Sequence, residues 1–198
     1  MMRNWILAFI FCCLANCHTQ AQNWDINTLK TINSWHIYDL SRGLSDSGIL
    51  LPIGVPTAMG VYALIKKDQP LLKDAIYIGT SVIEAVGITY GLKHIVDRPR
   101  PYVKYPNEIH RVEGPESSPS FPSGHTAAAF SLATSLSITY PKWYVIAPSA
   151  VWACGVGFAR MNQGVHYPSD VLAGAAIGVG CAFANIYINK WLNKILFE

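Results

Sequence analysis

The chain has 198 residues, of which 51% are hydrophobic and only 14% are charged, and its mean hydropathy is positive at +0.24. An ordinary soluble domain carries about 25% charged residues, so this deficit indicates a membrane protein of one domain. The formal net charge of +3 is too small to indicate nucleic acid as a partner. The five cysteines show no zinc-binding spacing, and we expect neither a metal nor another cofactor.

Residues 1–21 predict a secretory signal peptide. Arg3 supplies a positive start, residues 5–15 are apolar but too few for a comfortable span, and Ala21 ends a small-residue cleavage site. Two alternatives stay open. Cys17 could be lipidated, although Asn16 is a poor fit before it, and an uncleaved signal would act as one extra anchor.

Residues 22–46 predict an amphipathic helix. Apolar side chains recur at helical spacing among polar ones, and Trp24 and Trp35 are typical of the headgroup level of a bilayer. We expect this helix to lie on the membrane surface, ahead of a transmembrane domain over residues 47–198.

Five longer apolar segments predict an all-α, multi-span transmembrane helical bundle, because each is near the length that crosses the hydrocarbon core. Glycine, alanine and serine are common in these segments, which permits close helix packing. The third segment is short and could be a buried member of the bundle. The segments are residues 49–65, 71–92, 126–140, 143–158 and 171–188.

Lysines mark one end of the predicted bundle. Because successive spans alternate in direction, Lys66, Lys142 and Lys190 fall on the same side. The positive-inside rule makes that side cytoplasmic, and a cleaved signal agrees because it places the mature N-terminus outside. We therefore predict a multi-pass protein of the bacterial inner membrane, with residues 93–121 and 161–167 facing the periplasm.

Three polar clusters fall at the predicted outer ends of the apolar segments. Each residue alone has a simpler interpretation, as a snorkelling cation, a capping histidine or an acid at a helix start. Three clusters on one face favour a shared function instead. The clusters are Lys93 with Arg100-Pro101 after six residues, Pro122-Ser123-Gly124-His125, and Arg160 with His166 and Asp170 at intervals of five and three residues.

Together the clusters predict a phosphate site. Arginine offers a planar fork and lysine a point charge to phosphate oxygens. The helix start at Ser123 offers free N–H groups to an anion, and Gly124 permits a close approach. Asp170 can hold one nitrogen of His166 and leave the other free to attack, while His125 can protonate the leaving oxygen.

The clusters resemble the signature of the type 2 phosphatidic acid phosphatase (PAP2) superfamily, which is Lys-x6-Arg-Pro, Pro-Ser-Gly-His and Ser-Arg-x5-His-x3-Asp, over residues 50–189. The resemblance implies a six-helix core and metal-independent hydrolysis of a phosphate ester or anhydride. It implies a His166 nucleophile that forms a phosphohistidine, an Asp170 that orients it and a His125 acid. The phosphate-binding set that it implies is Lys93, Arg100, Ser123, Gly124 and Arg160.

Other polar residues have smaller expected roles. Ala159 stands where the family has serine, and the missing hydroxyl predicts weaker affinity, by about 1 kcal/mol for one hydrogen bond. Glu84 lies inside the second predicted span, where it could act in function or pair within the bundle. The loop before the second cluster should shape the entrance, where Glu108, Glu113 and Glu116 could repel some anionic substrates.

The sequence thus predicts an integral-membrane phosphatase that acts on a membrane lipid phosphate or diphosphate in the bilayer, with lipid A or undecaprenyl diphosphate preferred. The alternatives are a phosphatase of phosphatidylglycerol phosphate or phosphatidic acid, a vanadium-dependent haloperoxidase, and a non-enzymatic lipid-binding or transport protein. The motifs bind only the phosphate, so they do not choose the lipid tail, and the oligomeric state stays open.

Overall fold

The computed structural model describes residues 23–112, 114 and 116–197. The predicted signal peptide and the alternative lipidation at Cys17 lie outside these residues. Every regular element in the described part of the chain is a helix, which confirms the all-α prediction. The helices are one over residues 23–33, α2 (Tyr38–Lys66), α3 (Gln69–Val96), the short α4 (Pro101–Lys104), α5 (Gly124–Thr139), α6 (Trp143–Asn162) and α7 (Pro168–Phe197).

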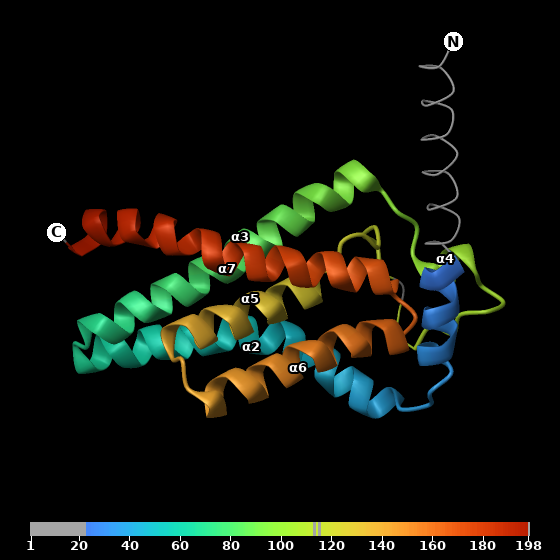
Figure 1. Cartoon of the computed structure of the whole chain (residues 1–198), viewed down its shortest axis with the longest axis horizontal. Coiled ribbons are helices and arrows are strands. Elements are labelled where there is room, and N and C mark those ends of the chain that lie inside the picture. Colours follow the sequence, from blue (N-terminus) through green and yellow to red (C-terminus); the bar gives the residue numbers. More distant parts are fainter. Residues whose placement is uncertain (1–22, 113, 115, 198) are drawn as a thin grey trace, which may run out of the picture.

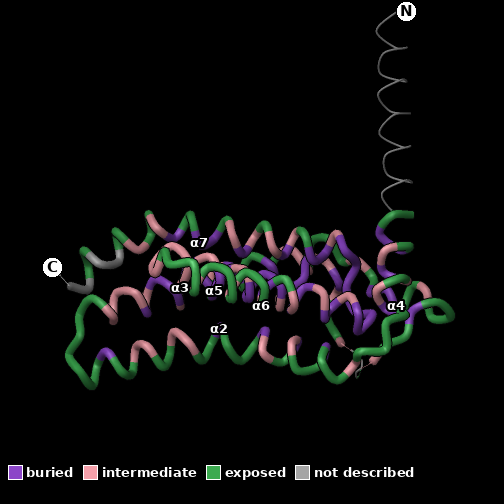
Figure 2. The backbone as a smooth tube through the Cα atoms, turned by 60° about the horizontal axis from the view of Figure 1, so that its bottom comes forward, coloured by how far each residue is buried: buried purple, intermediate pink, exposed green. Residues whose placement is uncertain are grey.

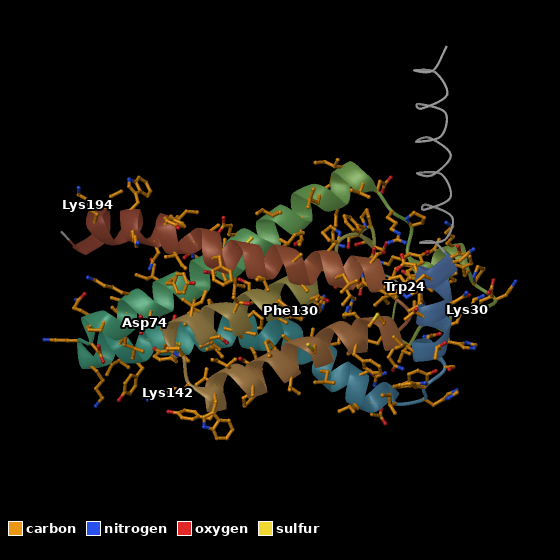
Figure 3. All side chains as sticks on the ribbon, in the orientation of Figure 1. Trp24, Lys30, Asp74, Phe130, Lys142 and Lys194 are labelled. Atoms are coloured by element: carbon orange, nitrogen blue, oxygen red, sulfur yellow. The ribbon has the colours of Figure 1, made fainter. Side chains whose placement is uncertain are left out.

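The long helices α2, α3, α5, α6 and α7 form one elongated bundle, and the helix over residues 23–33 crosses one end of it (Figure 1). The α2–α3 turn, the α5–α6 turn and the C-terminus lie toward the opposite end. Figure 3 places Lys142 and Lys194 there, and it places Trp24 and Lys30 at the end that residues 23–33 cross. The predicted basic turns therefore share one end of the bundle.

Four of the helical segments are long and apolar enough to cross a membrane by length and composition: Tyr38–Lys66, Gln69–Lys104, Trp143–Asn162 and Pro168–Trp191. The shorter α5 has 16 residues and packs against α2, α3, α6 and α7. Its buried residues are almost all alanine, serine and threonine, which allows the surrounding helices to approach it closely. By contrast, α2 is exposed along most of its length (Figure 2), as a lipid-facing helix would be.

Residues 23–46 form two helical pieces rather than the single helix predicted over residues 22–46. The first helix ends near Asn33, and α2 begins at Tyr38. The turn between them is held by amide hydrogen bonds, in which Asn162 Nδ2 donates to the carbonyl oxygens of Ile32 (2.8 Å) and Trp35 (2.7 Å). Because Asn162 belongs to α6, this break depends on tertiary structure and not on the local sequence pattern.

Two glycines of α7 permit its close contact with α5. A Cβ atom at Gly174 would lie 2.5 Å from the carbonyl oxygen of Ser123, and one at Gly178 would lie 2.3 Å from that of Ala127. Neither distance leaves room for a side chain. The backbone N–H of Ser123 also donates to the carbonyl oxygen of Asp170 (3.0 Å), so the beginnings of α5 and α7 are joined directly.

Candidate active site

Residues from the predicted clusters meet at one cavity of about 330 Å³. The cluster residues that line it are Lys93, Arg100, Gly124, His125 and His166. The remaining predicted site residues, Ser123, Arg160 and Asp170, are fully buried next to this lining. The structure therefore brings together all eight residues that the sequence predicted, from α3, α5, α6, α7 and the loops between them.

Three cations of the site come from separate parts of the chain. Lys93 lies in the last turn of α3, Arg100 follows that helix, and Arg160 lies in the last turn of α6. Both arginines are buried, at 3% and 2% exposure. Burial of a guanidinium is costly unless an anion or several acceptors surround it, so the site is built to hold negative charge.

Glu116 supplies the negative charge in this structure. One of its carboxylate oxygens pairs with Arg100 and the other with Arg160. Burial alone would raise the pKa of Glu116, but the two guanidinium groups outweigh it and lower that pKa to about 2. The sequence placed Glu116 only at the entrance, whereas the structure places it in direct contact with the predicted phosphate-binding arginines.

His166 and Asp170 face each other across the start of α7. Asp170 Oδ2 lies 3.5 Å from His166 Nδ1, which is longer than an ordinary hydrogen bond, and it accepts one from the backbone N–H of Tyr167 at 2.9 Å. On the other side of the ring, His166 Nε2 lies 3.4 Å from Arg100 Nη1. Asp170 thus lies on the Nδ1 side, and Nε2 is the nitrogen next to Arg100.

The turn before His166 requires glycine. Gly164 has a φ of +74°, and a Cβ atom there would lie 2.5 Å from the carbonyl oxygen of His110. This turn connects Arg160 at the end of α6 with His166 before α7. It therefore fixes the spacing between Arg160, a predicted phosphate-binding cation, and His166, the predicted nucleophile.

The charge state of His166 follows from its surroundings. Its ring is buried, and burial together with the positive charges of Arg160, Arg100 and Lys93 lowers its pKa well below 6.5. The imidazole is consequently neutral at neutral pH, and a neutral imidazole has the lone pair that a nucleophile needs.

The second cluster forms the start of α5 as predicted. Ser123 is the residue before the helix, and its Oγ accepts a hydrogen bond from Thr126 Oγ1 at 2.8 Å. His125 is the second helical residue and faces the cavity. A Cβ atom at Gly124 would come no closer than 3.8 Å to its nearest protein neighbour, Thr89 Oγ1. Protein packing therefore does not require this glycine, and its role toward a phosphate stays a prediction.

Sequence reasoning missed a second layer of residues behind Asp170. Arg98 Nη1 donates to Asp170 Oδ1 (2.6 Å) and to Ser169 Oγ (2.7 Å), and its Nη2 donates to Asp25 Oδ2 (2.8 Å). Asp25 Oδ1 accepts the backbone N–H of Ser169 at 2.8 Å. Arg98 lies between Lys93 and Arg100 in the sequence, so its position in the first cluster is a signal for it, whereas nothing in the sequence points to Asp25.

The minor candidates lie outside the cavity lining. Neither Glu84 nor Ala159 contributes to it, although Glu84 Oε2 is buried without a hydrogen-bond partner in the part of the chain that the structure describes. Among those residues there is also no group of three histidine, cysteine, aspartate or glutamate side chains placed to hold a metal ion.

Comparison with known proteins gives relatives among lipid phosphatases. The undecaprenyl-diphosphatase of Sulfolobus acidocaldarius is 30% identical over 130 residues, which cover 66% of this chain and 62% of that protein. The lipid A 1-phosphatase of Porphyromonas gingivalis is 37% identical over 82 residues, which cover 40% of this chain and 17% of that protein. These matches thus span less than two thirds of each relative's own length.

Solved structures share the fold. The crystal structure of Aquifex aeolicus LpxE superposes with a TM-score of 0.67 at 27% identity, over 82% of this chain and 94% of that chain. A transmembrane PAP2-type phosphatidylglycerolphosphate phosphatase from Bacillus subtilis gives a TM-score of 0.70 at 23% identity, over 98% and 96% of the two chains. The family model of the PAP2 superfamily matches residues 74–194, more than half of the sequence, and the chain belongs to that superfamily.

Proposed function

We propose that the protein is an integral-membrane, metal-independent phosphatase that hydrolyses a lipid phosphate or diphosphate through a phosphohistidine. The observation that carries this proposal is the setting of His166. It is buried and neutral, has Asp170 on its Nδ1 side, and has Nε2 next to the buried Arg100. A neutral imidazole next to a set of cations suits attack on a phosphoryl group, whose negative charge the cations stabilise.

In the first step, His166 Nε2 attacks the phosphorus atom and the bond to the leaving oxygen breaks. His125 donates a proton to that oxygen, so the lipid leaves as an alcohol or as a lipid monophosphate. Lys93, Arg100 and Arg160 hold the non-bridging oxygens. Asp170 stabilises the positive charge that the imidazole gains as its Nε2 becomes bonded to phosphorus.

In the second step, a water molecule attacks the phosphohistidine. His125, which lost its proton in the first step, accepts one from the water. The N–P bond breaks, inorganic phosphate is released, and the electron pair returns to Nε2 of His166. Each histidine then has its starting protonation state, and the reaction consumes only water.

The shape of the cavity supports a lipid substrate. Beyond the polar end, its lining continues along apolar side chains of α2, α3 and α5, which include Ile49, Ile53, Val82, Val86 and Ala128. A hydrocarbon chain next to these residues would be buried in apolar surroundings while its phosphate reached the cations. A small, freely soluble phosphate ester would gain nothing from this part of the cavity.

Two lipid classes are the preferred substrates, lipid A phosphates and undecaprenyl diphosphate. The names of the two sequence relatives support both of them, and the apolar lining suits either tail. We further propose that the site opens at the periplasmic face, because the basic turns lie toward the other end of the bundle (Figure 3).

The test is phosphate release by the purified full chain from undecaprenyl diphosphate, lipid A and phosphatidylglycerol phosphate, each in detergent micelles. We expect release from one of the first two, and a His166→Ala variant should lose it by at least about a thousandfold, as for removal of a nucleophile. The exposed His36 lies outside the cavity, so His36→Ala is the matched control.

Further measurements separate the alternatives. After rapid quenching, mass spectrometry of digests that are kept away from acid should find phosphate on His166. Unchanged turnover by His166→Ala would refute the mechanism, and loss of activity with a chelator would refute its metal independence. Halide oxidation in the presence of vanadate would favour the haloperoxidase, and release from phosphatidylglycerol phosphate alone would replace the preferred substrates.

A further inference from the structure

One short stretch of the loop before α5 engages the three cations of the phosphate site. Lys93 Nζ donates to the carbonyl oxygen of Pro119. Arg100 Nε donates to the carbonyl oxygen of Ser118 at 2.8 Å, and Arg100 Nη2 donates to Ser118 Oγ at 3.1 Å. Glu116, from the same stretch, pairs with Arg100 and Arg160.

The two oxygens of Glu116 imitate two oxygens of a phosphate. Each oxygen lies against a different arginine, so the carboxylate bridges groups that come from α6 and from the loop after α3. The pKa of about 2 keeps this carboxylate ionised. A phosphoryl group that binds both arginines must take the donors that Glu116 now occupies.

Glu116 is also able to leave. Its side chain is 30% exposed, whereas those of Arg100 and Arg160 are 3% and 2% exposed. The arginines are therefore fixed inside the bundle, and the carboxylate reaches them from the cavity side. A carboxylate carries one negative charge, so a phosphate with greater negative charge competes well for the same pair of cations.

We propose that Glu116 is a specificity-determining residue that occupies the phosphate position in the resting enzyme, is displaced by the phosphate of the substrate, and returns to displace the product phosphate. The proposal rests on the proposed function, because it assigns the same cations to the substrate. It gives Glu116 two effects: it excludes weakly charged ligands, and it prevents inorganic phosphate from remaining in the site.

The experiment measures the affinity of inorganic phosphate for the purified full chain by calorimetry, and the KM and phosphate inhibition constant with the lipid substrate. A ligand that must displace Glu116 binds with its intrinsic Kd divided by the fraction of open sites. We therefore expect Glu116→Gln to bind phosphate at least about tenfold more tightly, for a site that is about nine-tenths closed. Its KM and its phosphate inhibition constant should fall in parallel.

Glu108→Gln is the matched control, because it removes the same charge from the same loop. Glu108 pairs with Lys30 and does not line the cavity. Its phosphate affinity should equal that of the wild type. Glu116→Asp keeps the charge but shortens the reach, so its phosphate affinity should lie between those of the wild type and Glu116→Gln. If Glu116→Gln does not fold, the phosphate affinity of Glu116→Asp alone tests the proposal.

Unchanged or weaker phosphate binding by Glu116→Gln and Glu116→Asp would overturn the proposal, because Glu116 would then be a structural partner of the arginines and not a competitor. If the wild type still hydrolysed the lipid in a His166-dependent manner, only the proposal on Glu116 would fall. If the wild type neither hydrolysed a lipid phosphate nor bound inorganic phosphate, both proposals would fall.

Discussion

Arg98 Nη1 lies 2.6 Å from Asp170 Oδ1, and the Arg98 guanidinium stacks 3.8 Å from the centre of the Tyr167 ring. Arg98 thus contacts the Asp170 carboxylate on the side that faces away from His166, the proposed nucleophile, and fixes its position. Arg98 does not line the cavity. It is therefore a positioning residue, which acts on His166 through Asp170 and does not touch the substrate.

Replacement of Arg98 by lysine tests this role. Lysine keeps the charge but cannot contact Asp170, Ser169 and Asp25 at once, because it lacks the planar fork. A small misplacement of Asp170 and His166 should lower kcat by about 10- to 100-fold. KM should change little, since Lys93, Arg100 and Arg160, the cations proposed to bind phosphate, remain. Steady-state kinetics of purified Arg98→Lys gives both constants, and a raised KM with an unchanged kcat would show that Arg98 binds the substrate.

Asp25 should connect the helix over residues 23–33 to the site. It is buried and accepts hydrogen bonds from Arg98, the Ser169 N–H and the Ser169 hydroxyl. Asp25→Asn should lower the free energy of unfolding by about 2 kcal/mol, the range for hydrogen bonds to a charged group. Thermal unfolding in a single detergent measures this change in free energy, and Asp46→Asn, at an exposed position, is the control. Equal melting temperatures would show that residues 23–33 dock without Asp25.

The structure brings the predicted site residues together because they lie at helix ends. Lys93, Arg160 and Asp170 lie in a first or last helical turn. The ends of the apolar segments in the sequence indicate where these helices begin and end. Spans that alternate in direction then bring these ends to one side. Spacing along the chain was therefore enough to place the clusters together.

The residues that the sequence did not reveal act over long separations. Asp25 and Ser169 are 144 positions apart, and the break before α2 depends on Asn162, which is 127 positions from Trp35. Glu116 lies in a loop with no periodic pattern, and only the folded chain shows that it reaches two arginines. Such contacts are tertiary, so neither composition nor periodicity contains them.

The acid limb of the activity profile should lie below pH 6.5. Burial and the charges of Arg160, Arg100 and Lys93 lower the pKa of His166 well below that value, although Glu116 opposes them. Because protonation removes the lone pair, kcat/KM should hold through pH 6.5 and fall only at lower pH. Burial and the positive charges of Arg160, Arg100 and Lys93 lower the pKa of His125 to about 3 in the empty site, so His125 acts as the general acid only after the negative charge of the bound phosphate raises that pKa. An alkaline limb should therefore appear in kcat, which reports the complex, and not in kcat/KM. An acid midpoint at or above pH 6.5 would contradict the assignment.

The lowered pKa of His166 also makes the stability of the protein depend on pH. The unfolded chain protonates His166 near pH 6.5, whereas the folded chain does so only at lower pH. The unfolded state thus binds more protons below pH 6.5, so this histidine contributes stability above that pH and less as the pH falls. His166→Gln should therefore reduce the loss of melting temperature on acidification from neutral pH, and an unchanged dependence would refute the neutral state.

The close contact of α5 with α7 should determine both stability and the position of the helix start that we propose to bind phosphate. Gly174→Ala would place a methyl group against the carbonyl oxygen of Ser123, where only 2.5 Å is available, so the two helices must separate. Overpacking of this kind costs about 1–3 kcal/mol. Because Ser123 and His125 move with the start of α5, kcat/KM should also fall.

Gly180→Ala is the matched control for Gly174→Ala, since it makes the same change in the same helix at a position with no neighbour within 4 Å. Alanine has the higher helix propensity, so Gly180→Ala should leave the melting temperature unchanged or raise it, by up to about 1 kcal/mol in free energy. Its kcat/KM should match that of the wild type. Equal melting temperatures and activities of the two variants would show that the α5–α7 contact does not control the site. A loss confined to Gly174→Ala would instead show that backbone contact between the helices holds Ser123 and His125 in place.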